Sequence, residues 1–173
     1  MPYTYAIAEG DIPDHLGLAK FGMNDAVGAT YETVWDGNAP YVWPTSAGVV
    51  SIVSGDVEDD PDKGGAVAGT GAWTINVSGL DANYNAYNED VTLNGAGAVA
   101  TTGSFIRVFR MRVLTAGTDG TNKGTITASI GGTTCAIISA GYGQTLMALW
   151  TVPADYTLYL VDWYEYECSN ESK

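Results

Sequence analysis

The chain has 173 residues, of which 46 % are hydrophobic, 16 % are charged and 22 are glycine. The apolar share argues against global disorder, and one domain of this length buries roughly 70 % of its unfolded surface. Its 20 acidic and 7 basic residues give a net charge of −13, which argues against a nucleic-acid partner because phosphate contacts need clustered Lys and Arg. No segment approaches the ~20 apolar residues of a membrane helix, and the start of the chain lacks the pattern of a signal peptide. We therefore expect no membrane partner and synthesis in the cytoplasm.

Residues 1–30 differ from the rest of the chain. Tyr3, Tyr5 and Ile7 alternate with small residues, as in an extended segment. A short helix is predicted over His15–Lys20, capped by the preceding acidic residues and ended by Gly22. We interpret residues 1–30 as an N-terminal arm.

From Tyr31 onward, apolar runs of strand length alternate with turns rich in Gly, Asn, Asp and Thr. The predicted strands are Tyr31–Trp35, Tyr41–Trp43, Val49–Ser54, Ala72–Ser78, Glu89–Asn94, Ser104–Thr115, Lys123–Ile130, Thr134–Ile138, Thr145–Val152 and Tyr156–Tyr166. Short links favour antiparallel pairing, because parallel strands need long crossovers. The sequence thus predicts an all-β, antiparallel β-sandwich of jelly-roll type over residues 31–173, with an extended N-terminal arm.

The clearest loop is Gly55–Gly71, where an acidic run precedes a glycine-rich one. Its carboxylates are the best metal candidates, because oxygen ligands at alternate positions can gather around calcium. The acidic side chains are Asp56, Glu58, Asp59, Asp60 and Asp62. Pro61 and Val67 stand where an EF-hand needs Gly and Glu. A solvated surface loop is the favoured interpretation and calcium binding the minority one.

The sequence offers little for catalysis. His15 is the only histidine, and no nucleophile motif accompanies it. Gly95–Gly103 and Gly141–Thr145 lack the features of phosphate-binding loops and are interpreted as turns. Cys135 is expected to be a buried free thiol and Cys168 to be exposed, and with one histidine they cannot form an ordinary zinc site. We expect no enzymatic activity and no cofactor.

Three arginines, Arg107, Arg110 and Arg112, lie on one predicted strand. Such arginines pair with acids, either within the fold or across a subunit interface. The segment Thr145–Val152 is apolar on both faces, so Met147 and Trp150 are expected at the centre of a sandwich or under a neighbouring subunit.

Aromatic residues concentrate in two places. Trp35, Tyr41 and Trp43 form one group, and Trp163 to Tyr166 forms the other. Core packing and interface burial are the favoured uses of these rings, and a sugar-binding platform is the alternative. Trp43 joins the candidate interface residues.

The order of several segments resembles a family of virion structural proteins of tailed bacteriophages. The resemblance spans Phe21 to about Tyr166. It rests on FGMN (Phe21–Asn24), VWDG (Val34–Gly37), YVWP (Tyr41–Pro44), GLDANYN (Gly79–Asn85), EDVTLNG (Glu89–Gly95), SFIRVFR (Ser104–Arg110), LTAGTDGTNKGTI (Leu114–Ile126) and GQTLMALWTVPA (Gly143–Ala154).

The resemblance implies a particle component with no catalytic residues. The expected function is that of a capsid decoration or cement protein, a homo-oligomer with a trimer favoured, which contacts the major capsid protein or other virion proteins at the capsid surface. The alternative is a tail or fibre module that binds a host glycan through exposed Trp and Tyr. A polysaccharide-degrading virion enzyme is a third possibility.

Overall fold

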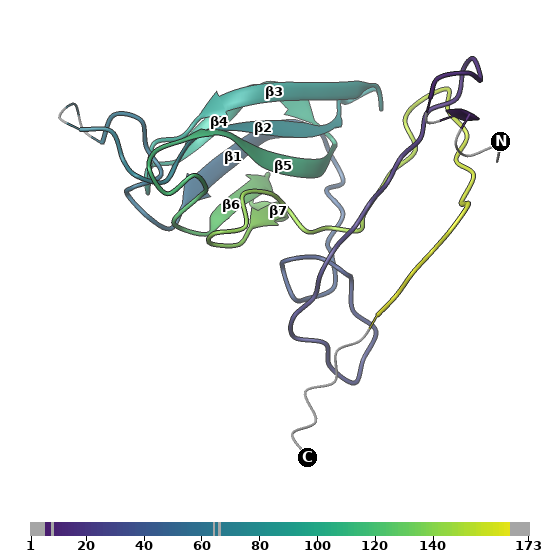
Figure 1. Cartoon of the computed structure of the whole chain (residues 1–173), viewed down its shortest axis with the longest axis horizontal. Helices are drawn as coiled ribbons and strands as arrows, with labels where there is room; N and C mark the ends of the chain where they lie inside the picture. The colour runs from purple at the N-terminus through teal and green to yellow at the C-terminus, as the bar shows by residue number, and fades with distance from the viewer. Residues whose placement is uncertain (1–5, 8, 64, 66, 167–173) are drawn as a thin grey trace.

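The chain forms two facing antiparallel sheets in the computed structural model, which describes residues 6, 7, 9–63, 65 and 67–166 (Figure 1). The strands are β1 (Gly48–Ser54), β2 (Ala72–Leu80), β3 (Ala86–Thr92), β4 (Val99–Phe105), β5 (Arg107–Ala116), β6 (Ile126–Ile130) and β7 (Thr133–Ile138). Among the described residues only Ala6 and Ile7 are helical. The all-β prediction is confirmed, while the expectations for Tyr3, Tyr5 and Cys168 lie outside the described residues.

The two sheets have four and three strands. The order is β4-β1-β6-β7 in the first sheet and β3-β2-β5 in the second, and every pairing is antiparallel, as predicted. The chain passes between the sheets after β1, β3, β4 and β5. Neighbouring strands within a sheet are therefore often distant in sequence.

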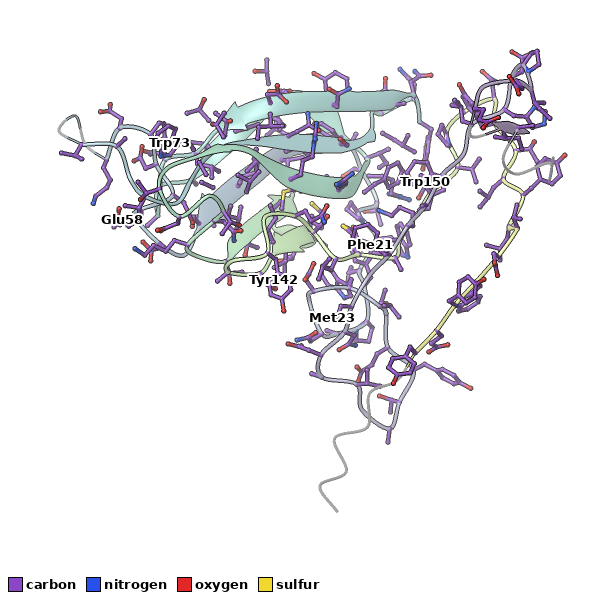
Figure 2. The ribbon with its side chains drawn as sticks, in the orientation of Figure 1. Phe21, Met23, Glu58, Trp73, Tyr142 and Trp150 are labelled. Atoms are coloured by element: carbon purple, nitrogen blue, oxygen red, sulfur yellow. The ribbon has the colours of Figure 1, made fainter. Side chains whose placement is uncertain are left out.

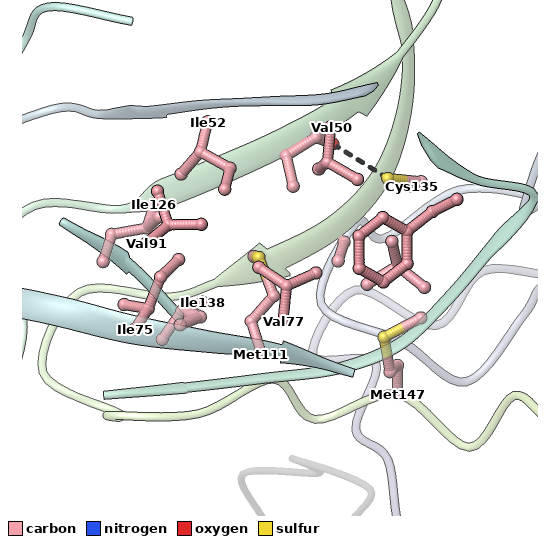
Figure 3. Packing of buried hydrophobic residues seen from close by; sticks show 14 of the residues in the cluster. Val50, Ile52, Ile75, Val77, Val91, Met111, Ile126, Cys135, Ile138 and Met147 are labelled. Atoms are coloured by element: carbon pink, nitrogen blue, oxygen red, sulfur yellow. Dashed lines mark hydrogen bonds between the residues drawn. The ribbon is translucent and has the colours of Figure 1, made fainter. Parts of the chain in front are cut away.

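The main core lies between the sheets (Figure 3). In β1 the period-2 pattern of a half-buried strand buries Val50 and Ile52 and leaves Ser51 and Val53 outside. The other strands contribute buried residues in the same way, notably Ile75, Val77, Met111, Ile126 and Ile138.

A β-bulge in the pairing of β2 with β5 changes which side chains face the main core at the start of β5. Gly79 pairs with Val108, and the next pair joins Ser78 to Arg110, so Phe109 is the extra residue. Val108 therefore joins the main core, whereas Phe109 packs in a second, smaller cluster with Leu80. Gly79 suits this place because a Cβ there would overlap the carbonyl oxygen of Arg107.

The single strand predicted over Ser104–Thr115 is wrong. Ile106 interrupts it, so β4 lies in the first sheet and β5 in the second. The backbone N–H of Ile106 donates to the carbonyl of Leu80 at 2.9 Å, which holds the chain at this corner. Gly95–Gly103, predicted as a turn, contains most of β4.

Four other predicted strands and the predicted helix are absent. Residues 9–47 and 139–166 contain no strand, so Tyr31–Trp35, Tyr41–Trp43, Thr145–Val152 and Tyr156–Tyr166 are corrected to irregular structure. His15–Lys20 forms no helix, because a six-residue segment with Gly17 inside has too few hydrogen bonds to offset nucleation.

The segment before β1 and the segment after β7 are hydrogen-bonded to each other at the edge of the sandwich. Met23 donates its N–H to Leu146 O at 3.1 Å, and Ala148 donates to Val34 O at 2.9 Å. The carboxylate of Asp36 accepts from the Leu146 N–H and the Ser139 hydroxyl. Beyond this junction the N-terminal and C-terminal segments extend away from the sheets (Figure 1).

Candidate interaction surface

The buried carboxylate of Asp59 organises the acidic loop. Its Oδ1 accepts from the N–H groups of Ala72 (2.7 Å) and Lys123 (2.8 Å), and its Oδ2 accepts from the Gly124 N–H (2.9 Å) and the Ser54 hydroxyl (2.5 Å). Four donors from three parts of the chain saturate a side chain with 0 % exposure. Asp59 is thus a structural connector between β1, β2 and the loop before β6.

The remaining acids of this loop point to separate partners. Asp56 and Asp60 each accept the N–H two residues ahead, and Glu58 binds Lys63 and the Thr70 N–H. Within the described residues no group of three His, Cys, Asp or Glu side chains is placed to hold a metal. The described residues of Gly55–Gly71 form a loop, as predicted. Asp59 and Asp60 near its start are buried, whereas Asp62, Lys63 and Val67 are exposed, so the solvated interpretation holds for part of the loop only.

The three arginines of β5 have different environments. Arg110 and Arg112 are exposed, and Arg110 donates to the amide oxygen of Gln144. Both ion pairs found among the described residues use lysines, Lys63 with Glu58 and Lys123 with Asp119. The predicted carboxylate partners of these arginines are therefore not within the described part of the fold, and a subunit interface remains the other predicted location.

The guanidinium of Arg107 lies near two aromatic rings. Its guanidinium carbon lies 5.1 Å from the centroid of Trp43 and 5.8 Å from that of Tyr84. One terminal nitrogen donates to Pro44 O and Ile106 O, while the buried Nε has no protein partner among the described residues. Trp43 is 41 % exposed, so the group reaches the surface with one face of its indole already occupied by the cation.

Met147 and Trp150 both pack within their own chain. Met147 is 1 % exposed and belongs to the main core (Figure 3). Trp150 is half-buried against Phe109, with ring centroids 4.1 Å apart. Of the six candidate interface residues, Trp43, Arg110 and Arg112 are the exposed ones.

Trp35 and Tyr41 are core residues, as the favoured interpretation of the first aromatic group predicted. Both are buried and meet edge to face. The Tyr41 hydroxyl donates to the carbonyl of Cys135 at 2.9 Å, and burial raises the pKa of Tyr41 well above its ordinary value. The prediction that Cys135 is a buried free thiol is confirmed, and burial raises its pKa to about 12.

Lys20 is a residue that the sequence reasoning missed. Its ammonium donates to the carbonyl oxygen of Phe109 at 2.7 Å, so the N-terminal segment is attached to β5. Burial, together with the nearby positive charge of Arg110, lowers the pKa of Lys20 to about 8. Lys20 and Arg110 thus lie close together at the same strand.

The terminal segments carry most of the exposed apolar side chains. Of the 23 large hydrophobic residues exposed in the described part, eight lie in residues 16–43 and eight in residues 156–166. The second group, whose side chains line the extended C-terminal segment in Figure 2, comprises Tyr156, Leu158, Tyr159, Leu160, Val161, Trp163, Tyr164 and Tyr166. The sequence carries this signal, because the run is apolar on both alternating faces, although the same pattern predicts a strand over Tyr156–Tyr166.

Comparison with known proteins identifies no relative: no family model, no curated protein and no solved structure matches this chain. In the described ranges no helix has the length and apolar character needed to cross a membrane. His15 is exposed, and its Nδ1 lies 2.9 Å from Pro13 O. Among the described residues, the candidate sites are therefore exposed surfaces rather than a pocket lined by convergent reactive groups.

Proposed function

We propose that the protein is a structural component of a tailed-bacteriophage particle, a decoration or cement protein of the capsid surface. It acts as a homo-oligomer, with a trimer favoured, and contacts the major capsid protein or other virion proteins, without a nucleic-acid or membrane partner and without enzymatic activity. The observation that carries this proposal is the exposed apolar surface of residues 16–43 and 156–166 beside a well-packed sandwich. Patches of this kind on soluble proteins are characteristic of association surfaces.

Two finer structural features belong to this proposal. The sandwich is of jelly-roll type, supported by the repeated passage of the chain between the sheets. Residues 1–30 act as an N-terminal arm, supported by the absence of strands over residues 9–47 and by exposed Leu16, Leu18 and Phe21. An arm that becomes ordered against a neighbour adds contact area, and a lattice of many copies multiplies a modest contact energy by avidity.

Electron microscopy of the intact particle tests this function. We expect density for the two sheets at hundreds of copies on the head surface. A position on the tail, with a few to a dozen copies, would replace the capsid assignment, and absence from the particle would end the proposal.

The alternative is a tail or fibre module that binds a host glycan. It is favoured by one observation, the half-exposed rings of Trp43 and Tyr84 near Arg107. A glycan-array signal that is lost in Trp43→Ala and retained in Tyr142→Ala, a matched exposed aromatic elsewhere, supports this alternative. Equal signals from both variants, or none from the wild type, reject it.

A further inference from the structure

We propose that Asp155–Tyr166 is a docking arm that binds a second copy of this chain, with its carboxylates against Arg110 and Arg112 of that copy. This inference goes beyond the proposed function, because it specifies how copies contact one another and applies wherever the protein is located. It rests on the exposure of the arm, the coverage of the sheet edges and the distribution of charge.

The arm begins where the chain leaves the sandwich. Trp150 packs on Phe109, and the Ala154 N–H donates to the carbonyl of Tyr84 at 2.8 Å. From Asp155 to Tyr166 every residue is exposed, including Trp163 at 72 %. Figure 1 shows this segment lying apart from the sheets. A stretch with eight large apolar side chains in water is unfavourable in an isolated chain, so it fits a partner surface.

The sheet edges of the same chain already have other contacts. The Val113 N–H donates to Gly143 O and the Thr145 N–H to Met111 O, so residues 143–145 cover the edge of β5. Tyr41 bonds the Cys135 carbonyl of β7. The arm is therefore not simply a displaced edge strand of its own sandwich.

The remaining edges, β3 and β4, face each other. The Glu89 carboxylate of β3 accepts from the Thr102 and Gly103 N–H groups of β4, at 2.6 and 2.9 Å. Two backbone N–H groups of β4 are therefore already bonded, and the docking proposed here uses side chains rather than addition of a strand to a sheet.

The distribution of charge indicates that the arm binds at β5. The arm contains Asp155, Asp162 and Glu165 and no basic residue. Arg110 and Arg112 are exposed on β5 without an ion pair to any described carboxylate, in a chain with a net charge of −13. Complementary patches of this kind orient association and fix its register.

The partner is a second copy because donor and acceptor are encoded in one chain. The arm lies apart from its own sheets, so its side chains are free to meet β5 of another molecule (Figure 1). A surface that carries both halves of a contact can repeat around a symmetry axis and close into a symmetric oligomer. The acidic arm and the two arginines of β5 therefore complement each other without a different macromolecule.

The experiment compares the mass of full-length variants by sedimentation velocity over a concentration series. Wild type is expected to sediment as an oligomer, and Leu158→Ser/Leu160→Ser/Trp163→Ser as a monomer. The variant should keep the urea midpoint that the wild type shows at concentrations where it is dissociated, because these side chains touch solvent in the single chain. Arg110→Glu/Arg112→Glu is expected to weaken association by roughly tenfold or more. Asp162→Arg/Glu165→Arg should do the same.

Combining the two charge reversals tests the pairing itself. The fourfold variant should recover most of the lost affinity, whereas the matched control Lys63→Glu/Lys123→Glu, which changes the charge equally on other loops, should associate like the wild type. A monomeric wild type, or an unchanged mass for the arm variant, overturns the proposal. Dissociation of the arm variant without rescue by the charge swap overturns Arg110 and Arg112 as the acceptor. Neither result depends on finding the protein in a particle, so it is separate from the test of the proposed function.

Discussion

The carboxylate of Asp59 accepts a hydrogen bond from the backbone N–H of Ala72, at 2.7 Å in the buried interior of the loop. This contact joins the acidic loop after β1 to the first residue of β2. Further bonds from Lys123 and Gly124 bring in the segment before β6. One side chain therefore ties both sheets together at the end of the sandwich, and Gly71 next to it has no room for a Cβ.

Asp59→Asn is expected to destabilise the protein by about 2–4 kcal/mol. The amide that replaces one oxygen carries N–H donors, and these face donors in a site where the wild-type carboxylate only accepts. Urea unfolding followed by fluorescence measures the difference. Asp62→Asn, an exposed acid of the same loop, is the control and should stay within about 0.5 kcal/mol of wild type. Equal stability of the two variants would show that Asp59 is not the connector.

Gly79→Ala tests the bulge that turns Phe109 out of the main core. A methyl group there overlaps the Arg107 carbonyl, so β2 and β5 must separate locally, at a cost of about 1–3 kcal/mol. The melting temperature should fall accordingly. The matched change Gly17→Ala, at a site where an added Cβ meets no atom within 4 Å, should leave it unchanged. A stable Gly79→Ala variant would contradict the described register.

The sequence predicts an element of this fold where a local pattern determines its position, and fails where a tertiary contact does. The burial of Ile75 and Val77 follows from the alternation of a half-buried strand over the predicted Ala72–Ser78, and both side chains are buried. The position of Trp73 is not predictable in this way, because an irregular register at the start of β2 leaves its side chain half-exposed. Its indole N–H donates to Gly69 O. The corner at Ile106 likewise depends on a tertiary bond to Leu80 that no local pattern encodes.

The same limit applies to the candidate surface. The acidic run suggests five equivalent ligands, and only the three-dimensional arrangement separates buried Asp59 from exposed Asp62. The apolar character of Tyr156–Tyr166 is visible in the sequence, but whether such a run pairs in a sheet or extends into solvent depends on which edges remain available. Here those edges have other contacts.

Cys135 should resist thiol reagents until the protein unfolds. Burial raises its pKa to about 12, so the reactive thiolate is scarce at pH 8, and the side chain is inaccessible as well. In a Cys168→Ser background, labelling in native buffer should follow the rate of unfolding and become fast in urea. Immediate stoichiometric labelling in native buffer would contradict the buried position.

Lys20 should make stability rise with pH between about 8 and 10.5. Burial and the neighbouring Arg110 lower its pKa to about 8 in the folded protein, against 10.5 as its ordinary value. In that window the unfolded chain binds more protons than the folded one, so raising the pH removes a penalty on folding. Below pH 8 Lys20 is charged in both states and the gain is absent. Cys135 and Tyr41, with raised pKa values, act in the opposite direction within the same window, from their ordinary values of 9.0 and 10.0 upward.

The contribution of Lys20 is isolated by comparison with Lys20→Met. Urea unfolding of both proteins from pH 7 to 10.5 gives their stability difference at each pH. Because Tyr41 and Cys135 are common to both, their effects cancel, and the loss of the bond to Phe109 O is a constant offset. We expect the wild type to gain stability relative to the variant as pH rises through this window. A difference that does not vary with pH would show that the Lys20 ammonium is as well solvated in the folded chain as in the unfolded one.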